Sequence, residues 1–154
     1  MMFKTHLALG ILVSVLVINY LQLESWILFG ITLVFASVLP DIDISKSKVG
    51  KKFWPLSSII SFLFGHRGFI HTIFPPIIAV STATIFGYGT LGLAFLTGYG
   101  THLISDIVTV QGLMPFFPLS KIKASGFIIT GGLIEHTVFF GALIFLLRVV
   151  MTTF

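Results

Sequence analysis

Long apolar runs separated by short polar stretches make up most of the chain. A helix needs about 20 mostly apolar residues to cross the hydrocarbon core of a bilayer, within a range of roughly 17–25. Five runs come close to that length: His6–Leu23, Trp26–Leu39, Phe69–Phe86, Leu91–Ile107 and Leu133–Val150. This pattern predicts an all-α, multi-pass transmembrane helix bundle with about five spans.

Two local features modify this bundle. The apolar run Leu56–Phe64 is too short to span, so we expect an interfacial or re-entrant segment there. Pro75 and Pro76 lack backbone N–H donors and are expected to kink the third span. No internal repeat or linker divides the sequence, so residues 1–154 are expected to form a single domain.

The composition excludes a soluble domain. The chain is 56% hydrophobic and 9% charged, whereas soluble domains carry about 25% charged residues. It contains no cysteine, which excludes disulfides and thiolate metal sites. No small-residue cleavage site follows a short apolar core, so a cleaved signal peptide is not expected. The net charge of +4 comes from basic residues that flank apolar runs, so we expect no nucleic-acid partner.

The basic residues indicate an orientation. With five spans, all but one lie on the membrane face that holds the N-terminus: Lys4, Lys46, Lys48, Lys51, Lys52, Arg67, Lys121 and Lys123. Arg148 alone lies toward the opposite face. Because cytoplasmic loops carry an excess of Lys and Arg, we expect a protein of the cell (inner) membrane with a cytoplasmic N-terminus.

Histidines and acids gather on the same face. All five histidines and four of the five acids lie there, and only Glu24 lies elsewhere. The group is His6, Asp41, Asp43, His66, His71, His102, Asp106, Glu135 and His136. Ionisable groups near membrane depth are costly and usually mark a functional site. The sequence therefore predicts one site built from the ends of all the spans, on the cytoplasmic side.

Two motifs have competing interpretations. In "HLISD", His102 and Asp106 are four residues apart and share one face of a helix. They are either two ligands of one metal or a histidine whose tautomer is held by a carboxylate. In "LPDID", Asp41 and Asp43 point opposite ways if the segment is extended. One of the two is then a ligand, unless both belong to a hydrated loop.

The remaining candidates lie in "GHRGFIHT" and "GGLIEHT". His66 and His71 reach one site only if a turn precedes the helix. Arg67 offers a planar fork for a phosphate or carboxylate, or else serves as a topology determinant. Glu135 is a ligand, a general base or an acidic helix cap. His136 is expected at the periphery of the site.

Imidazoles and carboxylates without thiolates suit Zn²⁺, with Mn²⁺ or Fe²⁺ as alternatives. The candidates suffice for two or three ions. The sequence has no nucleophile elbow, no glycine-rich phosphate loop and no HExxH motif. Water activated by a metal is therefore the expected nucleophile.

The segments "THLALG", "LPDID", "GHRGFIHT", "GYGTHLISDIVTVQGLMPFFP" and "GGLIE" occur in this order over nearly the whole chain. In this they resemble the YdjM-like family of membrane-bound metal-dependent hydrolases. The ligand order is also similar to that of zinc-dependent phospholipases C, although their later H-x-x-x-E pair is absent here. The resemblance implies the metal ligands His6, Asp41, His71, His102 and Asp106, with His66 and Glu135 as further candidates.

From these features we expect hydrolysis of a phosphoester, on a lipid or lipid-linked substrate within reach of the membrane. Arg67 would neutralise the phosphate, and Asp43 or Glu135 would act as general base. Lys121 and Lys123 would bind the anionic head group or the membrane surface.

Three other functions stay open: ester or amide hydrolysis at the same site, transport of a metal ion or proton, and a purely structural role. Transport is disfavoured because few polar residues lie near mid-membrane. The oligomeric state does not follow from the sequence.

Overall fold

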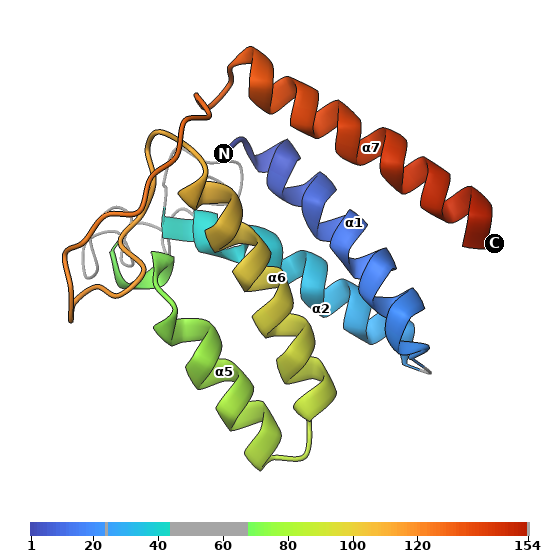
Figure 1. Ribbon diagram of the computed structural model, residues 1–154. Helices are drawn as coiled ribbons and strands as arrows, with labels where there is room; N and C mark the ends of the chain where they lie inside the picture. Colours follow the sequence, from blue (N-terminus) through green and yellow to red (C-terminus); the bar gives the residue numbers. More distant parts are fainter. Residues whose placement is uncertain (24, 44–67, 154) are drawn as a thin grey trace.

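The computed structural model describes residues 1–23, 25–43 and 68–153, which form helices joined by turns and one long loop (Figure 1). The helices are α1 (Phe3–Leu21), α2 (Trp26–Val38), α5 (Phe74–Ile85), α6 (Gly89–Ile107) and α7 (Leu133–Thr153). Two short 3₁₀ helices, η1 (Leu39–Asp43) and η2 (Phe69–His71), complete the described elements. The described residues contain isolated β-bridges but no strand, so the all-α prediction is confirmed.

The predicted number of spans needs correction. Among the described helices, only α1 and α7 are long and apolar enough to cross a membrane. At 1.5 Å per residue, the 13 residues of α2 and the 12 of α5 measure about 20 and 18 Å, less than the roughly 30 Å of a hydrocarbon core. Helix α6 has 19 residues but is less apolar, because it contains several glycines and threonines as well as His102 and Asp106. The predicted segment Leu56–Phe64 lies outside the described residues.

The two prolines do not kink a span. Helix α5 begins at Phe74, so Pro75 and Pro76 occupy its first turn. N–H groups there have no partner within the helix, and proline is tolerated for that reason. The predicted third span is instead divided into η2 and α5.

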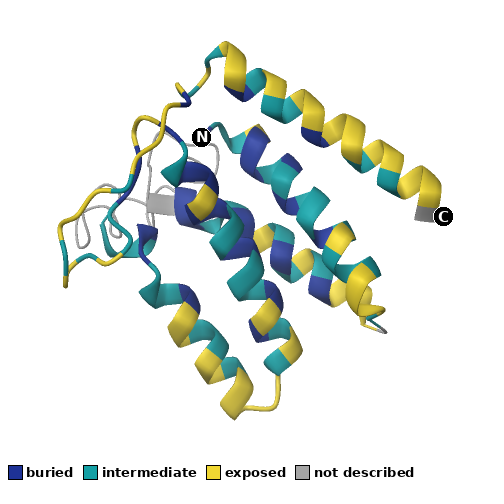
Figure 2. Ribbon diagram, viewed as in Figure 1, coloured by how far each residue is buried: buried dark blue, intermediate teal, exposed yellow. Residues whose placement is uncertain are grey.

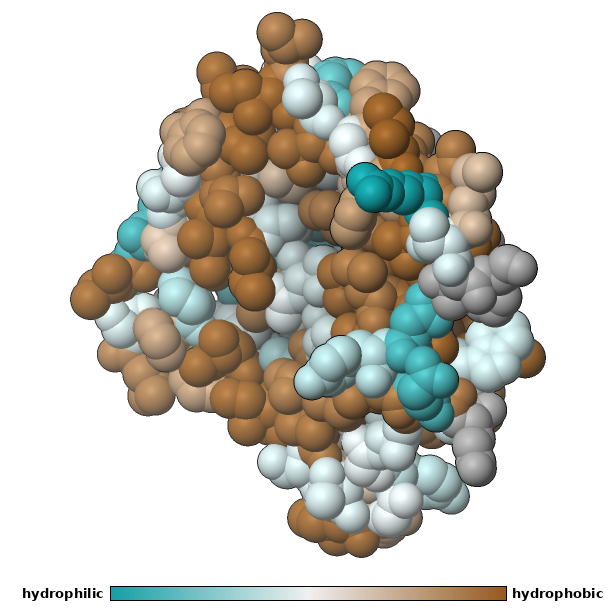
Figure 3. All heavy atoms as spheres, turned by 45° about the vertical axis from the view of Figure 1, so that its right-hand side comes forward, coloured by the Kyte–Doolittle hydropathy of each residue, from teal (hydrophilic) through white to brown (hydrophobic). Residues whose placement is uncertain are grey.

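The helix ends that carry polar residues lie at one end of the bundle. Figure 1 shows the starts of α1, α5 and α7 at the same end as the last turns of α2 and α6. Helix α2 packs against both α1 and α6, while α5 packs on α6 and α7 on α1. Buried residues concentrate in α1, α2 and α6, whereas α7 is mostly exposed (Figure 2). The face drawn in Figure 3 is largely apolar and has a hollow near its middle. This end of the bundle therefore combines burial with polarity.

Two glycines allow α2 to approach its neighbours closely. A Cβ on Gly98 in α6 would collide with the backbone carbonyl of Leu33, and one on Gly10 in α1 with the side chain of Ser37. Small residues at helix crossings let backbones come together in this way. As a result, Ser37 at the end of α2 lies between α1 and α6, next to the polar end of the bundle.

The loop between α6 and α7 folds back over the same end. Backbone pairs link Thr109 to Ile128 and Leu113 to Ala124. Leu113 is buried in the core with Tyr99 and Leu103 of α6. The loop is thereby fixed on the bundle and closes the polar end.

Candidate metal centre

The last two turns of α6 provide a histidine and an aspartate on one face. His102 and Asp106 are both buried, and Nε2 of His102 lies 3.8 Å from Oδ2 of Asp106. The four-residue spacing in a helix produces this arrangement directly. Asp106 is the point on which the other histidines converge.

Helix α1 supplies His6. Its Nε2 lies 3.4 Å from Oδ1 of Asp106, and its ring stacks on that of His102 with centroids 4.0 Å apart. The amino group of Met1 also contacts Oδ1 of Asp106. His6 is 1% exposed, so it is a fully buried polar side chain near the start of an otherwise apolar helix.

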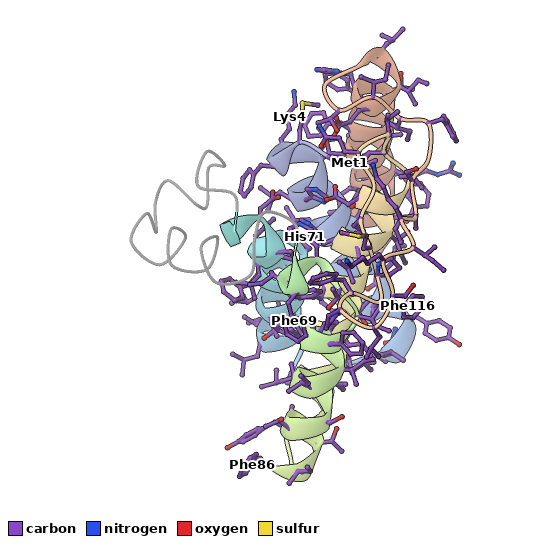
Figure 4. The ribbon with its side chains drawn as sticks, turned by 90° about the vertical axis from the view of Figure 1, so that its left-hand side faces the viewer. Met1, Lys4, Phe69, His71, Phe86 and Phe116 are labelled. Atoms are coloured by element: carbon purple, nitrogen blue, oxygen red, sulfur yellow. The ribbon has the colours of Figure 1, made fainter. Side chains whose placement is uncertain are left out.

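The short helix η2 supplies His71. Its Nε2 lies 3.9 Å from Oδ2 of Asp106, and its ring meets His102 edge-on at 5.3 Å. The hydroxyl of Tyr99 on α6 donates a hydrogen bond to the Ile70 carbonyl. This bond ties η2 to α6 and holds His71 over the centre. Figure 4 shows His71 and Met1 in the same part of the molecule, with Phe86 at the far end of α5.

Asp41 belongs to η1, which follows α2. The predicted extended segment is wrong, because Leu39–Asp43 form a 3₁₀ helix. Burial raises the pKa of Asp41, and the neighbouring His6 partly offsets this effect. The backbone of Asp43 lies in the same 3₁₀ helix, but its side chain is outside the described part.

These side chains form two overlapping groups with metal-binding geometry. One is His6, Asp41 and His102, and the other is His71, His102 and Asp106. Within each group the potential ligand atoms lie within 4.8 Å of one another, and every residue is buried. His102 is common to both groups, so the two groups share one ligand.

The hydrogen bonds of two histidines identify which ring nitrogen carries the proton. Nδ1 of His102 lies 2.9 Å from the Ser37 carbonyl, which can only accept, so Nδ1 is the donor. Nδ1 of His6 lies 2.9 Å from Oγ of Ser105, whose single proton is donated to the His102 carbonyl. Nδ1 of His6 must therefore donate as well. In a neutral ring with this arrangement the lone pair is on Nε2.

These lone pairs face the carboxylate of Asp106. Nε2 of His6 and Nε2 of His102 are buried and have no hydrogen-bond partner within the described residues. A lone pair that faces a carboxylate is repelled by it unless a cation lies between them, and buried polar atoms without partners cost free energy. The amino group of Met1 already places one positive charge at Oδ1 of Asp106. Histidines that bind a metal commonly donate their other N–H to a carbonyl or hydroxyl, as here. The donor set therefore fits a divalent cation.

Glu135 occupies a different position. It is buried at the start of α7, and its carboxylate accepts hydrogen bonds from the backbone N–H groups of Met2 and Gly131, each at 2.6 Å. It thus links the starts of α1 and α7 and belongs to neither ligand group. The ring of neighbouring His136 bonds the Gly132 carbonyl at 2.9 Å through Nδ1.

Two other predicted site residues, Lys121 and Lys123, are not part of this cluster. Both are exposed on the loop between α6 and α7. His66 and Arg67 lie outside the described residues, so their predicted roles as ligand and phosphate-binding group stay predictions.

Sequence reasoning missed the residues that orient the histidines: Ser37, Tyr99 and Ser105. Only Ser105 carried a signal, since it lies three residues after His102 inside "HLISD". The position of Ser37 depends on the α2–α6 crossing, and an apolar helix gives no indication of it in advance.

Comparison with known proteins agrees with a membrane protein. The sequence profile described as YdjM inner membrane protein matches residues 1–153. The uncharacterized protein YvsG of Bacillus subtilis is 31% identical over 140 residues, which cover 90% of this chain and 87% of that protein.

The inner membrane protein YdjM of Escherichia coli is 29% identical over 91 residues, which cover 55% of this chain and 46% of that protein. The alignment thus spans about half the length of YdjM. No solved structure matches the chain. The match over nearly the whole length shows that the chain belongs to the YdjM inner membrane protein family.

Proposed function

We propose that this membrane protein is a metal-dependent hydrolase that cleaves a phosphoester of a lipid or lipid-linked substrate. The observation that carries the proposal is the convergence of Nε2 of His6 and Nε2 of His102 on the Asp106 carboxylate in a buried centre. A purely structural role would leave Nε2 of His102 buried and without a hydrogen-bond partner among the described residues.

The residues of the centre have distinct parts in this hypothesis. His6, Asp41, His71, His102 and Asp106 would hold the ions, with Zn²⁺ favoured and Mn²⁺ or Fe²⁺ as alternatives. Bound divalent ions supply Lewis acidity toward a phosphate and lower the pKa of water. The two carboxylates provide the negative charge that neutral imidazoles lack. Ser37 and Ser105 hold the rings of His102 and His6 in place.

The proposed reaction breaks one P–O bond of a phosphoester. The hydroxyl of a water molecule becomes bonded to phosphorus, and the proton of that water leaves with the departing alcohol. A cationic centre suits this reaction because negative charge accumulates on the phosphate oxygens. Arg67, Lys121 and Lys123 are candidates for binding the phosphate or the head group. Asp43 is a candidate general base, and Glu135 is less suited because both of its described hydrogen bonds tie down backbone N–H groups.

The orientation proposed for the chain places the centre on the cytoplasmic side. Lys4, Lys121 and Lys123 belong to segments at the same end as the centre, whereas Arg148 is near the opposite end of α7. The positive-inside rule then directs the centre to the cytoplasm. In this arrangement α1 and α7 cross the bilayer, and the shorter helices complete a multi-pass bundle around the centre.

The first test is the metal content of purified protein, measured by mass spectrometry after incubation with Zn²⁺, Mn²⁺ or Fe²⁺. We expect one or more equivalents in the wild type and a loss in His102→Ala and Asp106→Ala. His136→Gln is the matched control, because this histidine lies outside both ligand groups and should leave the metal content unchanged. Circular dichroism checks that each variant is folded. An absence of bound metal in the folded wild type, with every ion tried, would exclude the mechanism.

The second step identifies the bond that is cleaved. Metal-loaded protein is incubated with phospholipids and isoprenoid phosphates, and released phosphate and head groups are quantified. Release that disappears in Asp106→Ala supports phosphoester hydrolysis. Release of fatty acid alone would assign ester hydrolysis to the same centre and contradict the proposed substrate class.

A further inference from the structure

An apolar cavity adjoins the metal centre. It lies between α1, α6 and α7, has a volume of about 370 Å³, and its lining includes Met1 as well as Ile128 of the α6–α7 loop. Ligand pockets in proteins commonly measure about 300–1,000 Å³. The cavity is therefore large enough to hold part of a small molecule.

One end of the cavity reaches the centre itself. Met1, which lines it, contacts Asp106 through its amino group, and Ser105, which also lines it, bonds the ring of His6. From there the cavity runs along α1 past Leu9 and Val13. These residues lie three and seven positions beyond His6, which corresponds to about 4.5 and 10.5 Å along the helix axis.

The lining consists mostly of apolar side chains, and the hydroxyl groups that it contains already donate hydrogen bonds within α6. Leu9, Val13, Ile104 and Val138 are hydrocarbon side chains. The hydroxyl of Thr101 donates to the Thr97 carbonyl, so its hydrogen is used within α6 and its methyl group is left for the cavity.

The hydroxyl of Ser105 likewise donates to the His102 carbonyl. The lining therefore offers a ligand almost no hydrogen-bonding capacity, and the occupant must itself be apolar over this length.

The cavity is open at a surface that would face the hydrocarbon of the bilayer when α1 and α7 cross it. Two of its walls are α1 and α7, the described helices that are long and apolar enough to cross a membrane. Ile104 at the rim is 66% exposed. The other large apolar cavity, lined by Ser14, Trp26 and Ile27, lies at the opposite end of α1 and does not adjoin the centre.

We infer that the α1–α6–α7 cavity binds one hydrocarbon chain of the lipid substrate and so delivers its phosphate to the metal centre. This inference rests on the proposed function for the identity of the ligand as substrate. The polar group of a lipid whose chain lies along Val13 and Leu9 meets His6 and Asp106 at the end of the cavity. A chain held in this way would select lipids over water-soluble phosphoesters.

Photo-crosslinking tests the inference without requiring turnover. The full chain in detergent micelles is irradiated with hexadecyl phosphate that carries a diazirine in mid-chain, and the labelled peptides are identified by mass spectrometry. We expect label on the cavity-lining parts of α1 and α6, and several-fold less label there in Val13→Trp and Ile104→Trp, which fill the cavity. Leu16→Trp and Ile78→Trp are matched controls at exposed positions outside it and should leave the labelling unchanged.

The outcomes separate this inference from the proposed function. Label distributed evenly over outward-facing residues of α5 and α7, or undiminished by both cavity tryptophans, would overturn it. Because Ile104 is exposed, its tryptophan variant is expected to fold even if that of Val13 does not. Cavity labelling that persists in His102→Ala supports chain binding independent of the metal. If metal binding fails in the wild type while cavity labelling succeeds, the hydrolase proposal fails and the chain-binding site stands.

Discussion

At the residue scale, the chemistry of the centre depends on the direction of two ring protons. The Ser37 carbonyl and the Ser105 hydroxyl each accept an Nδ1–H, so that Nε2 of His102 and Nε2 of His6 point into the centre. Ser37 acts through its backbone, so a side-chain substitution leaves its acceptor in place. Ser105 acts through its hydroxyl and can be tested directly.

Ser105→Ala should weaken metal binding by about 10–100-fold, the usual effect of losing a group that orients a ligand. Without the hydroxyl, the His6 ring loses the acceptor that holds its tautomer and orientation. Competition with a chromophoric chelator measures the affinity. Ser81→Ala on the exposed surface of α5 is the control and should bind as the wild type does. An affinity unchanged in Ser105→Ala would contradict the assigned tautomer.

Part of the centre could be predicted from sequence at this scale. The His102–Asp106 pair follows from helix periodicity, and the convergence of His6, Asp41 and His71 follows from counting helix ends. The position of Glu135 did not follow, because a buried acid at a helix start has the same sequence pattern whether it faces a metal or caps backbone N–H groups.

At the scale of elements, the position of α2 determines where the centre forms. Gly98 permits α6 to touch the backbone of α2 at Leu33, and Ser37 lies one helical turn further along α2. A displacement of α2 therefore moves the carbonyl that orients His102. A substitution that displaces α2 should therefore change both the stability of the fold and the metal affinity.

Gly98→Ala should lower the stability by about 1–3 kcal/mol, as expected when extra atoms are forced into a packed contact. Gly100→Ala on the same helix is the matched control, since no atom lies within 4 Å of the position that its new methyl group would take. That change should be neutral or stabilising by about 0.5–1 kcal/mol, because alanine favours the helix. Thermal unfolding followed by circular dichroism in detergent compares the two variants. Equal melting temperatures would show that the close α2–α6 approach is absent.

The helix boundaries show what an apolar run can and cannot reveal. The runs located α1, α2, α6 and α7 to within a few residues, because burial in lipid and burial in protein require the same side chains. They did not reveal that the predicted third span is divided at His71 and Thr72. The residues on both sides of that break are equally apolar, and the break is fixed by hydrogen bonds to Tyr99 and Pro115 and by those of the Thr72 hydroxyl.

At the scale of the whole molecule, the centre and the chain-binding cavity form one continuous site. The centre lies where the helix ends meet, and the cavity extends from it along α1 toward the exposed rim at Ile104. A lipid could enter sideways from the bilayer and react without leaving it. This arrangement requires the centre to lie near the membrane surface, with the loop between α6 and α7 on the aqueous side.

The orientation can be measured because the sequence contains no cysteine, so an introduced thiol is unique. Ile122 lies on the α6–α7 loop and is 76% exposed, and Met151 lies near the end of α7 and is 75% exposed. Each can be replaced by cysteine, as Ile122→Cys and Met151→Cys. If the centre is cytoplasmic, a membrane-impermeant maleimide applied to intact cells should label Met151→Cys and leave Ile122→Cys unlabelled. Both should react after the cells are permeabilised, which controls for intrinsic reactivity. The reverse pattern would place the centre on the outer face, and equal labelling of both in intact cells would show that α7 does not separate the two ends of the molecule across the membrane.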